Sequence, residues 1–143
     1  MTIYFYTKNQ PYGEFSNFSK HGVELDDKWW KTVEHYFQAK KFANPEYQEK
    51  IRLAHDPNQA ANLGRSRKVP IRSDWEEIKD SIMREAVKKK FETHPELREL
   101  LLNTCEEEIV ENAPGDYYWG CGADGSGKNM LGKILCEVRS EMA

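Results

Sequence analysis

Three polar side chains, Glu34, Gln38 and Lys41, have the types and the spacing that acid, base or nucleophilic chemistry requires. The segment from Val33 to Phe42 reads V-E-H-Y-F-Q-A-K-K-F and predicts a helix that Thr32 opens as its N-cap. On such a helix, positions i, i+4 and i+7 share one face, so a carboxylate, an amide and an amine form a single stripe.

Aromatic residues flank this stripe. At about 100° per residue, Phe37 falls roughly 60° to one side of Glu34 and Phe42 roughly 80° to the other. The carboxylate and the amine of Lys41 would then lie between rings at a partly dry surface, where pKa values shift. The alternative interpretation is an ordinary Glu–Lys pair that supports a surface helix. Residues outside this helix must decide between the two.

A glycine-rich segment, D-Y-Y-W-G-C-G-A-D-G-S-G-K-N, runs from Asp116 to Asn129 and is the second candidate for chemistry. It matches a dinucleotide fingerprint and a P-loop only in part, because the buried parallel strand of the first and the Ser or Thr of the second are missing. Glycines such as Gly120 still let a ligand approach the backbone, and free amides where a helix starts favour an anion. We expect a phosphate or an oxyanion here, with Asn129 as helix N-cap or as a ligand contact.

Two further features fit a ligand with a planar base and a phosphate. Trp119 lies beside Asp116 in a loop with little core to fill, so its ring could stack on a base; the alternative is a plug between loop and helix. Arg65, Arg67 and Lys68 form a basic cluster. This cluster is either a phosphate anchor or a solvated basic turn.

Composition excludes several classes of protein. The chain has 143 residues and a formal charge of −3, which argues against a general binder of the nucleic-acid backbone. Its three cysteines lack a C-x-x-C spacing, which indicates a reducing compartment, and we expect a cytoplasmic protein. The four histidines show no zinc-ligand spacing. We therefore expect no metal. No apolar stretch approaches the ~20 residues that span a bilayer, so we expect no membrane partner either.

The elements that would position these residues are mostly helices. Residues 1–30 alternate short β-like runs with turns, whereas N-caps followed by proline, or capping boxes, mark four helix starts after residue 40. These signals stand at Asn44-Pro45 and Asp56-Pro57, and at Ser73-x-x-Glu76 and Thr93-x-x-Glu96. Gly64 is placed to end the second of these helices. We expect a single domain, residues 1–143, of the α+β class: predominantly helical, with a small, mostly antiparallel sheet.

Five segments together resemble the NADAR family, also called YbiA-like, in the family's order and over nearly the whole chain. They are P-Y-G-E-F-S-N-F (11–18), W-K-T-V-E-H-Y-F-Q-A-K-K-F (30–42), L-G-R (63–65), the helical segment 75–91, and D-Y-Y-W-G-C-G-A-D-G-S-G-K-N-M-L-G-K-I-L (116–135). The resemblance is specific, because the blocks E-H-Y-F-Q-x-x-K-F and W-G-x-G-x-x-G-x-G-x-N-x-L-G rarely occur together by chance.

The resemblance implies an N-glycosidase. Members similar to this chain hydrolyse the bond between ribose 5-phosphate and the amine of early riboflavin-pathway pyrimidines, and others remove ADP-ribose from guanine bases. The short chain looks more like the bacterial enzymes of the first kind. The implied partner is a phosphoribosyl or ADP-ribosyl small molecule, with nucleic acid as a partner only in the second case, and no cofactor or metal is required.

Cleavage of an N-glycoside builds positive charge on the sugar, so the site needs a carboxylate, a proton for the departing amine and an anchor for the phosphate. Glu34 and Asp116 are the carboxylate candidates. Lys41 would act as a general acid or, when neutral, as a nucleophile that forms a Schiff base, and both routes stay open. The remaining candidates would contact the substrate: Ser16, Asn17 and Asn129 at the ribose, Phe18 and Trp119 at the base, Arg65 and the glycine-loop amides at the phosphate, with Gln38 and Gly120 in the same site.

A module that binds ADP-ribose or NAD without cleaving it is the competing class. It would use the same arginines, tryptophan and glycine loop, but it needs no acid and amine beside its ligand. The Glu34/Lys41 pair therefore favours an enzyme. An interaction scaffold would leave the polar stripe unexplained.

Overall fold

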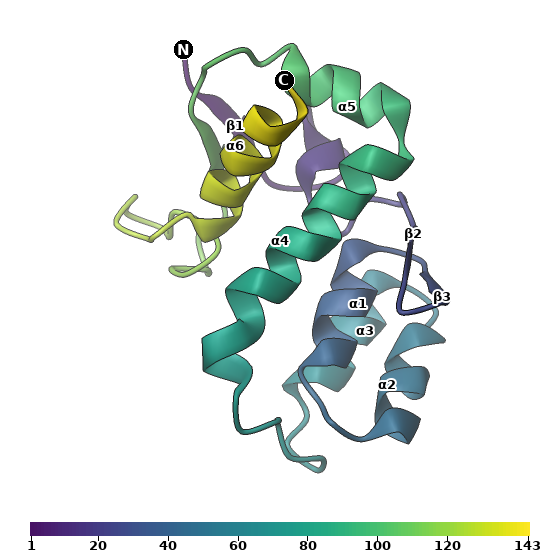
Figure 1. Cartoon of the computed structure of the whole chain (residues 1–143). Helices are drawn as coiled ribbons and strands as arrows, with labels where there is room; N and C mark the ends of the chain where they lie inside the picture. Colours follow the sequence, from purple (N-terminus) through teal and green to yellow (C-terminus); the bar gives the residue numbers. More distant parts are fainter. The chain divides into compact units, whose positions relative to one another are not determined.

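A computed structural model describes the whole chain, residues 1–143 (Figure 1). Its residues form two compact units, which we call the central unit (residues 20–90) and the terminal unit (residues 1–19 and 91–143). Six α-helices, a 3₁₀ helix and four short strands confirm the predicted α+β class. None of the helices has the apolar length needed to cross a bilayer. The single domain stays a prediction.

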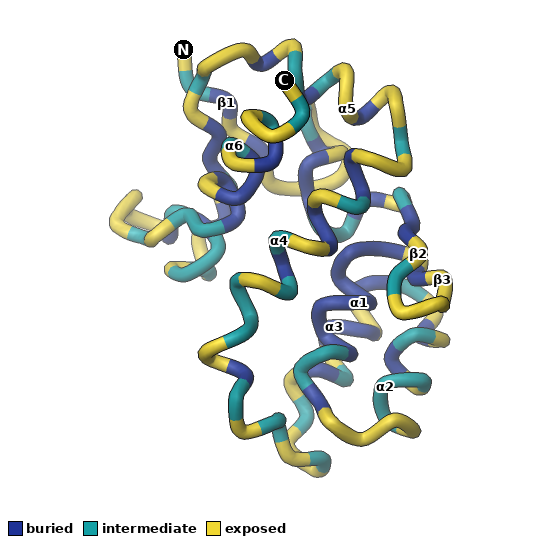
Figure 2. Tube along the Cα trace, in the orientation of Figure 1, coloured by how far each residue is buried: buried dark blue, intermediate teal, exposed yellow.

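The central unit is built around one buried helix. Helix α1 packs against both α2 and α3, and every residue from Val33 to Ala39 is buried, as the dark segment in Figure 2 shows. The interpretation of Glu34 and Lys41 as a pair on a surface helix is therefore wrong. The elements of this unit are β2 (Val23–Leu25), β3 (Lys28–Trp30), α1 (Val33–Lys40), α2 (Pro45–Arg52), α3 (Pro57–Arg65) and α4 (Trp75–Thr93) up to Lys90.

Side-chain caps start the first three helices as predicted. The Thr32 hydroxyl accepts the His35 N–H, Asn44 accepts the N–H groups at the start of α2, and Asp56 accepts the Gln59 N–H. Each bond satisfies an amide that the helix itself leaves without a partner.

The two predicted capping boxes are wrong. Helix α4 begins at Trp75, because the carbonyl of Asp74, and not that of Ser73, accepts the first intrahelical bonds. Thr93 is the last residue of α4, and His94 takes the N-cap position of α5 without a side-chain bond. In this second case proline at the first helical position fixes the start one residue later than the box predicted.

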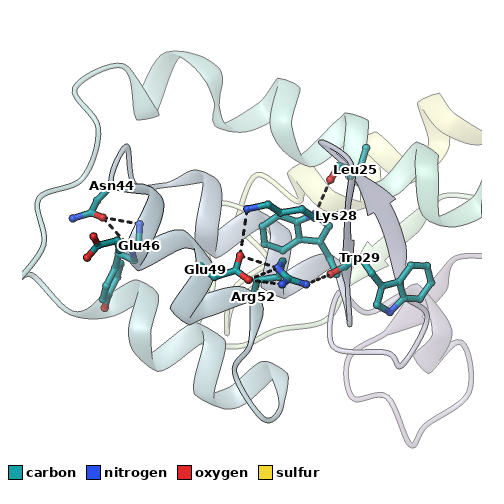
Figure 3. A network of polar contacts seen from close by, with 9 residues as sticks. Leu25, Lys28, Trp29, Asn44, Glu46, Glu49 and Arg52 are labelled. Carbon is teal, nitrogen blue, oxygen red and sulfur yellow. Dashed lines mark hydrogen bonds and ion pairs between the residues drawn. The ribbon is translucent and has the colours of Figure 1, made fainter.

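A polar network joins the antiparallel β2–β3 pair to α2 (Figure 3). Arg52 bonds to the Glu49 carboxylate and donates from Nη1 to the Trp29 carbonyl at 3.2 Å, while Lys28 Nζ lies 3.3 Å from Glu49. The Arg52 guanidinium, helped by Lys28, holds the pKa of Glu49 at about 2. The network orients the short ribbon that leads into α1.

The terminal unit carries the second pair of strands. Strand β1 (Ile3–Phe5) pairs in parallel with β4 (Ile109–Glu111), so the antiparallel arrangement expected from the sequence is confirmed for β2–β3 alone. Helix α6 (Met130–Met142) packs against β4, and α5 (Pro95–Leu102) packs against α6. A 3₁₀ helix at Gly13–Phe15 completes the unit.

Candidate active site

Glu34, Gln38 and Lys41, which we call the site triad, form a hydrogen-bonded chain along α1. Gln38 Nε2 donates to the Glu34 carboxylate at 2.8 Å, and Lys41 Nζ donates to Gln38 Oε1 at 3.4 Å. Glu34 is only 8% exposed and Gln38 9%, whereas Lys41 is half-buried at the C-cap of the helix. The predicted stripe exists, and it lies in the interior of the central unit.

Gln38 has a different role from the substrate contact expected from the sequence. Its amide nitrogen faces the carboxylate and its amide oxygen faces the amine, so both ends are used within the protein. The two bonds fix the orientation of the amide. Gln38 thus links Glu34 to Lys41 through one hydrogen bond on each side.

Gly64 of α3 completes the surroundings of Lys41. Its carbonyl accepts a second bond from Lys41 Nζ, at 3.2 Å. A Cβ at this glycine would stand 1.9 Å from Gln38 Oε1 and 3.2 Å from Gln38 Cβ, so only glycine lets α3 approach the triad this closely. The sequence indicated Gly64 only as a helix end.

The pKa of the Lys41 amine lies below its ordinary value. Burial is the largest cause, followed by the positive charges of Arg67 and Arg65, while Glu34 and Glu76 act in the opposite direction. A neutral amine is therefore more accessible at Lys41 than at a surface lysine.

The neighbouring lysine has other contacts. Lys40 Nζ lies 3.0 Å from Asp26 Oδ2 and stands over the Tyr36 ring. Of the two adjacent lysines, only Lys41 bonds to Gln38 and to the Gly64 carbonyl.

The two arginines after Gly64 point to different partners. Arg65 is exposed and its guanidinium bonds to the side-chain oxygen of Asn62, in its own helix. Arg67 reaches back instead: its Nη1 donates to the Gly64 carbonyl at 2.9 Å and to the Ser66 carbonyl at 3.1 Å. Arg67, which was one member of a basic cluster in the sequence, thus shares an acceptor with Lys41.

The aromatic residues that were expected to flank the stripe at a partly dry surface are buried in the core. Phe37 packs on Trp75 with ring centroids 5.0 Å apart, and Phe42 makes an edge contact with Tyr47 at 4.7 Å. Both rings lie in the core, Phe42 with no exposed surface and Phe37 with 6%. They keep the triad helix in apolar surroundings, in which the lowered pKa of Lys41 is expected.

His35 is a structural residue. It is fully buried, its Nε2 lies 3.1 Å from the Ala54 carbonyl, and its Nδ1 lies 2.8 Å from the Thr32 hydroxyl. A carbonyl can only accept, so Nε2 carries the proton and Nδ1 accepts from the hydroxyl. Burial lowers the pKa of this imidazole, which fits a neutral ring.

The glycine loop uses its own amides. The N–H groups of Asn129, Met130 and Leu131 donate to the carbonyls of Gly120, Tyr118 and Trp119 at 2.9–3.1 Å. The expectation of free amides for an anion at the start of α6 is therefore wrong, because the preceding loop folds back and occupies them. These three amides are not available to an anion, and phosphate binding elsewhere along the loop stays a prediction.

Asn129 stands at the N-cap position of α6, but its side chain makes no cap bond. Its backbone is left-handed, with φ 52°, and its amide accepts the Glu111 N–H and donates to the Ile109 carbonyl, both at 2.9 Å. The side chain therefore closes the edge of β4. With both ends in use, it does not support the ribose contact expected from the sequence.

Asp116 shapes the loop around Trp119. One oxygen, Oδ1, accepts the N–H groups of Tyr118 and Trp119 at 3.0 and 2.8 Å. Asp116 and Trp119 are half-buried, so both are within reach of a ligand. Gly120 is buried, and a Cβ there would lie 2.9 Å from the Glu111 carbonyl oxygen, so close packing requires glycine, and its contact with a ligand stays a prediction.

The remaining candidates lie in the turn after the 3₁₀ helix of the terminal unit. The Ser16 hydroxyl accepts the Phe18 N–H at 3.1 Å and is 5% exposed, whereas Asn17 and Phe18 are half-buried. Ser16 is thus part of the turn itself.

The candidate residues are divided between the two units. Glu34, Gln38, Lys41 and Arg65 belong to the central unit, and Ser16, Asn17, Phe18, Asp116, Trp119, Gly120 and Asn129 belong to the terminal unit. No group of three or more His, Cys, Asp or Glu side chains could hold a metal ion. The absence of a metal from the chemistry stays a prediction.

Comparison with protein families decides the relationship of the chain, since the NADAR domain matches residues 4–143. The chain belongs to the NADAR family. It is 53% identical to an N-glycosidase of Nostoc punctiforme, over 99% of the chain and 93% of that protein. It is 48% identical to N-glycosidase YbiA of Escherichia coli K12, over 99% of the chain and 88% of that protein. The chain is an N-glycosidase, a hydrolase of N-glycosyl compounds.

A solved structure and a plant relative extend this comparison. The NMR structure of E. coli YbiA matches with a TM-score of 0.92 at 47% identity and covers 99% of the chain and 84% of that chain. The riboflavin biosynthesis protein PYRR of Zea mays is 41% identical over 98% of the chain, which spans 25% of that longer protein.

Proposed function

We propose that this N-glycosidase hydrolyses the bond between ribose 5-phosphate and the amine of a phosphoribosylamino-pyrimidine of the riboflavin pathway. The observation that carries the proposal is the buried site triad, in which an acid and an amine on one helix are linked through the Gln38 amide. The substrate class is supported by two relatives, in Zea mays and in Vibrio vulnificus, that are named riboflavin biosynthesis proteins. The products are ribose 5-phosphate and the free aminopyrimidine.

Glu34 supplies the negative charge that the reaction needs. As the C–N bond breaks, positive charge builds on the sugar, and a carboxylate in a water-poor setting stabilises it far better than one in bulk solvent. Asp116, whose Oδ2 is not used to hold the loop amides, is the second carboxylate candidate. One of the two would also align the water molecule.

Lys41 has two chemical options. As an ammonium it would donate a proton to the departing amine. As a neutral amine it would bond to the ribose carbon while the C–N bond to the pyrimidine breaks, give up its own proton to that amine, and form a Schiff base that water hydrolyses. The lowered pKa of Lys41 supports the second route.

Three substrate contacts remain in the proposal. Trp119 would stack on the pyrimidine, with Phe18 as a further ring, and Arg65 would hold the phosphate. The Arg65 guanidinium is exposed and bonds to a neutral amide, so its charge is available to an anion. The proposal requires no cofactor, and the reducing cytoplasm expected from the cysteine pattern is its proposed location.

The test is metal-free incubation of the purified protein with 5-amino-6-(5-phosphoribosylamino)uracil and, separately, with ADP-ribosylated guanosine. We expect release of ribose 5-phosphate from the first substrate and no ADP-ribose from the second. Glu34→Gln keeps the shape and should lower turnover at least about 100-fold, whereas Glu24→Gln, at the exposed position of strand β2, should match wild type.

Two outcomes would contradict the proposal. Release of ADP-ribose alone would assign the chain to de-ADP-ribosylation of guanine, with nucleic acid as a partner. No release from either substrate, together with binding of ADP-ribose, would indicate a binding module.

A further inference from the structure

Two arginines without an acidic partner, Arg65 and Arg67, lie in the segment beside Lys41. Arg67 bonds to two main-chain carbonyls and Arg65 to the Asn62 amide, so neither guanidinium pairs with a carboxylate. Other cations of the central unit are paired differently: Lys40 lies against Asp26, Arg52 against Glu49 and Arg72 against Asp74. The lack of a carboxylate partner is therefore a local feature of the end of α3 and the residues that follow it.

Lys41 and Arg67 meet at one atom. The Gly64 carbonyl oxygen accepts Lys41 Nζ at 3.2 Å and Arg67 Nη1 at 2.9 Å, so the two nitrogens are at most about 6 Å apart. Two cations this close disfavour each other. Arginine cannot lose its proton in a protein, so the lysine is the member of the pair that can become neutral.

We infer that Arg67 is a positioning residue whose charge, set beside Lys41 at the shared Gly64 carbonyl, lowers the proton affinity of the Lys41 amine. The inference rests on the proposed function, because the neutral amine is the form that the Schiff-base route needs. Arg65 and Arg67 are both exposed but have different roles, because Arg65 bonds to Asn62 and Arg67 bonds to the carbonyl that also accepts Lys41.

The other charges that face Lys41 are consistent with this role. Arg65 acts in the same direction as Arg67 but more weakly, and Glu34 and Glu76 oppose them. Gln38 stands between Glu34 and the amine. Glu76 is also paired with Lys79 and is largely exposed, so solvent screens its effect. Arg67 is exposed as well, but it shares the Gly64 acceptor with Lys41 and is therefore the charged side chain best placed to disfavour the proton on Lys41.

The experiment measures the proton on Lys41 directly. The rate of acylation of Lys41 by an amine-reactive reagent is followed from pH 6 to 11 by peptide mass spectrometry, with Lys40 as an internal control in the same peptide. The proteins are wild type, Arg67→Gln, Arg67→Lys and Lys68→Gln, each checked for its fold by circular dichroism. Lys68→Gln removes the same charge one residue away.

We expect the Arg67→Gln change to move the midpoint for Lys41 upward by about half a pH unit or more, as loss of one charge about 6 Å away requires. Arg67→Lys and Lys68→Gln should stay near wild type, and the Lys40 profile should not move. In turnover, Arg67→Gln should lose activity near pH 7 and recover it as the pH rises. A merely structural role would not produce such recovery.

The inference is wrong if the Lys41 profiles of wild type and Arg67→Gln superimpose, or if Lys68→Gln shifts the midpoint equally. Acylation needs no substrate, so it separates this result from the proposed function. A shifted midpoint in a protein that releases no ribose 5-phosphate would refute the function alone, whereas turnover without a shift would refute the role of Arg67 alone.

Discussion

An amide between an acid and an amine is the feature at the residue scale that sets this site apart from an ordinary ion pair. If Glu34 and Lys41 touched directly, the carboxylate would hold the proton on the amine. Gln38 donates one hydrogen bond to the Glu34 carboxylate and accepts one from the Lys41 amine, which keeps both groups in place. The pattern of the sequence predicted the shared face, but it could not predict Gly64 or Arg67, because these residues reach the triad only through tertiary packing.

Gly64→Ala tests this arrangement. The added Cβ would stand 1.9 Å from Gln38 Oε1, so the Gln38 side chain must turn away and break both of its bonds. Alanine favours a helix by about 1 kcal/mol over glycine, but the broken bonds of the buried Gln38 amide cost more, so the free energy of unfolding should fall by about 1–3 kcal/mol. We expect kcat/KM to fall at least about 10-fold, measured beside urea unfolding.

Gly115→Ala is the matched control, because a Cβ at that glycine meets nothing within 4 Å. Full activity of Gly64→Ala with an intact fold would show that the orientation of Gln38 does not matter.

At the scale of elements, each helix of the site depends on a side chain outside it. Thr32 starts α1 through the His35 N–H, and Asn129 ties the start of α6 to strand β4. The N-cap bond of Thr32 could be predicted from the sequence because its two residues are close in the chain. The bonds of Asn129 could not, since the partner strand lies about twenty residues earlier and the left-handed backbone of Asn129 leaves no sequence signal beyond the residue type.

Asn129→Ala should lower the free energy of unfolding by about 2–3 kcal/mol. The change leaves the Glu111 N–H and the Ile109 carbonyl without their partner and places alanine in a left-handed backbone. Asn129→Gly, which loses the same bonds but tolerates the backbone, should cost less. Urea unfolding measures both, and an Asn129→Ala protein as stable as wild type would contradict the assigned role.

His35 predicts a pH dependence of stability. Burial lowers its pKa in the folded state below the value near 6.5 of the unfolded chain, so the unfolded state binds the proton more readily. Its contribution to stability is therefore complete above about pH 6.5 and is lost as the pH falls below that value. His35→Gln keeps a donor for the Ala54 carbonyl and cannot titrate.

We expect the free energy of unfolding to depend less on pH between about 7 and 5 in His35→Gln than in wild type. His55→Gln, at an exposed position, should keep the wild-type slope. Equal slopes for wild type and His35→Gln would show that His35 does not titrate in this range.

At the scale of the whole molecule, the sequence predicted the α+β class and the acid–amine face, because helix periodicity and N-caps are local signals. The sequence-based prediction was wrong where two segments compete for the same residue or the same amide groups. The capping box at Thr93 gave way to the last turn of α4, and the glycine-loop amides expected to bind an anion are used by the loop's own carbonyls. The net charge of −3 likewise did not indicate that two arginines beside Lys41 lack an acidic partner.

The central claim is that Lys41 and its triad carry out the cleavage. The most direct measurement is single-turnover release of ribose 5-phosphate from 5-amino-6-(5-phosphoribosylamino)uracil by Lys41→Met and Lys40→Met. Each variant removes the amine of one of two adjacent lysines, and of these only Lys41 bonds to Gln38 and to the Gly64 carbonyl. We predict a loss of at least about 100-fold for Lys41→Met and a rate within a few-fold of wild type for Lys40→Met. Equal rates in the two variants would contradict the account.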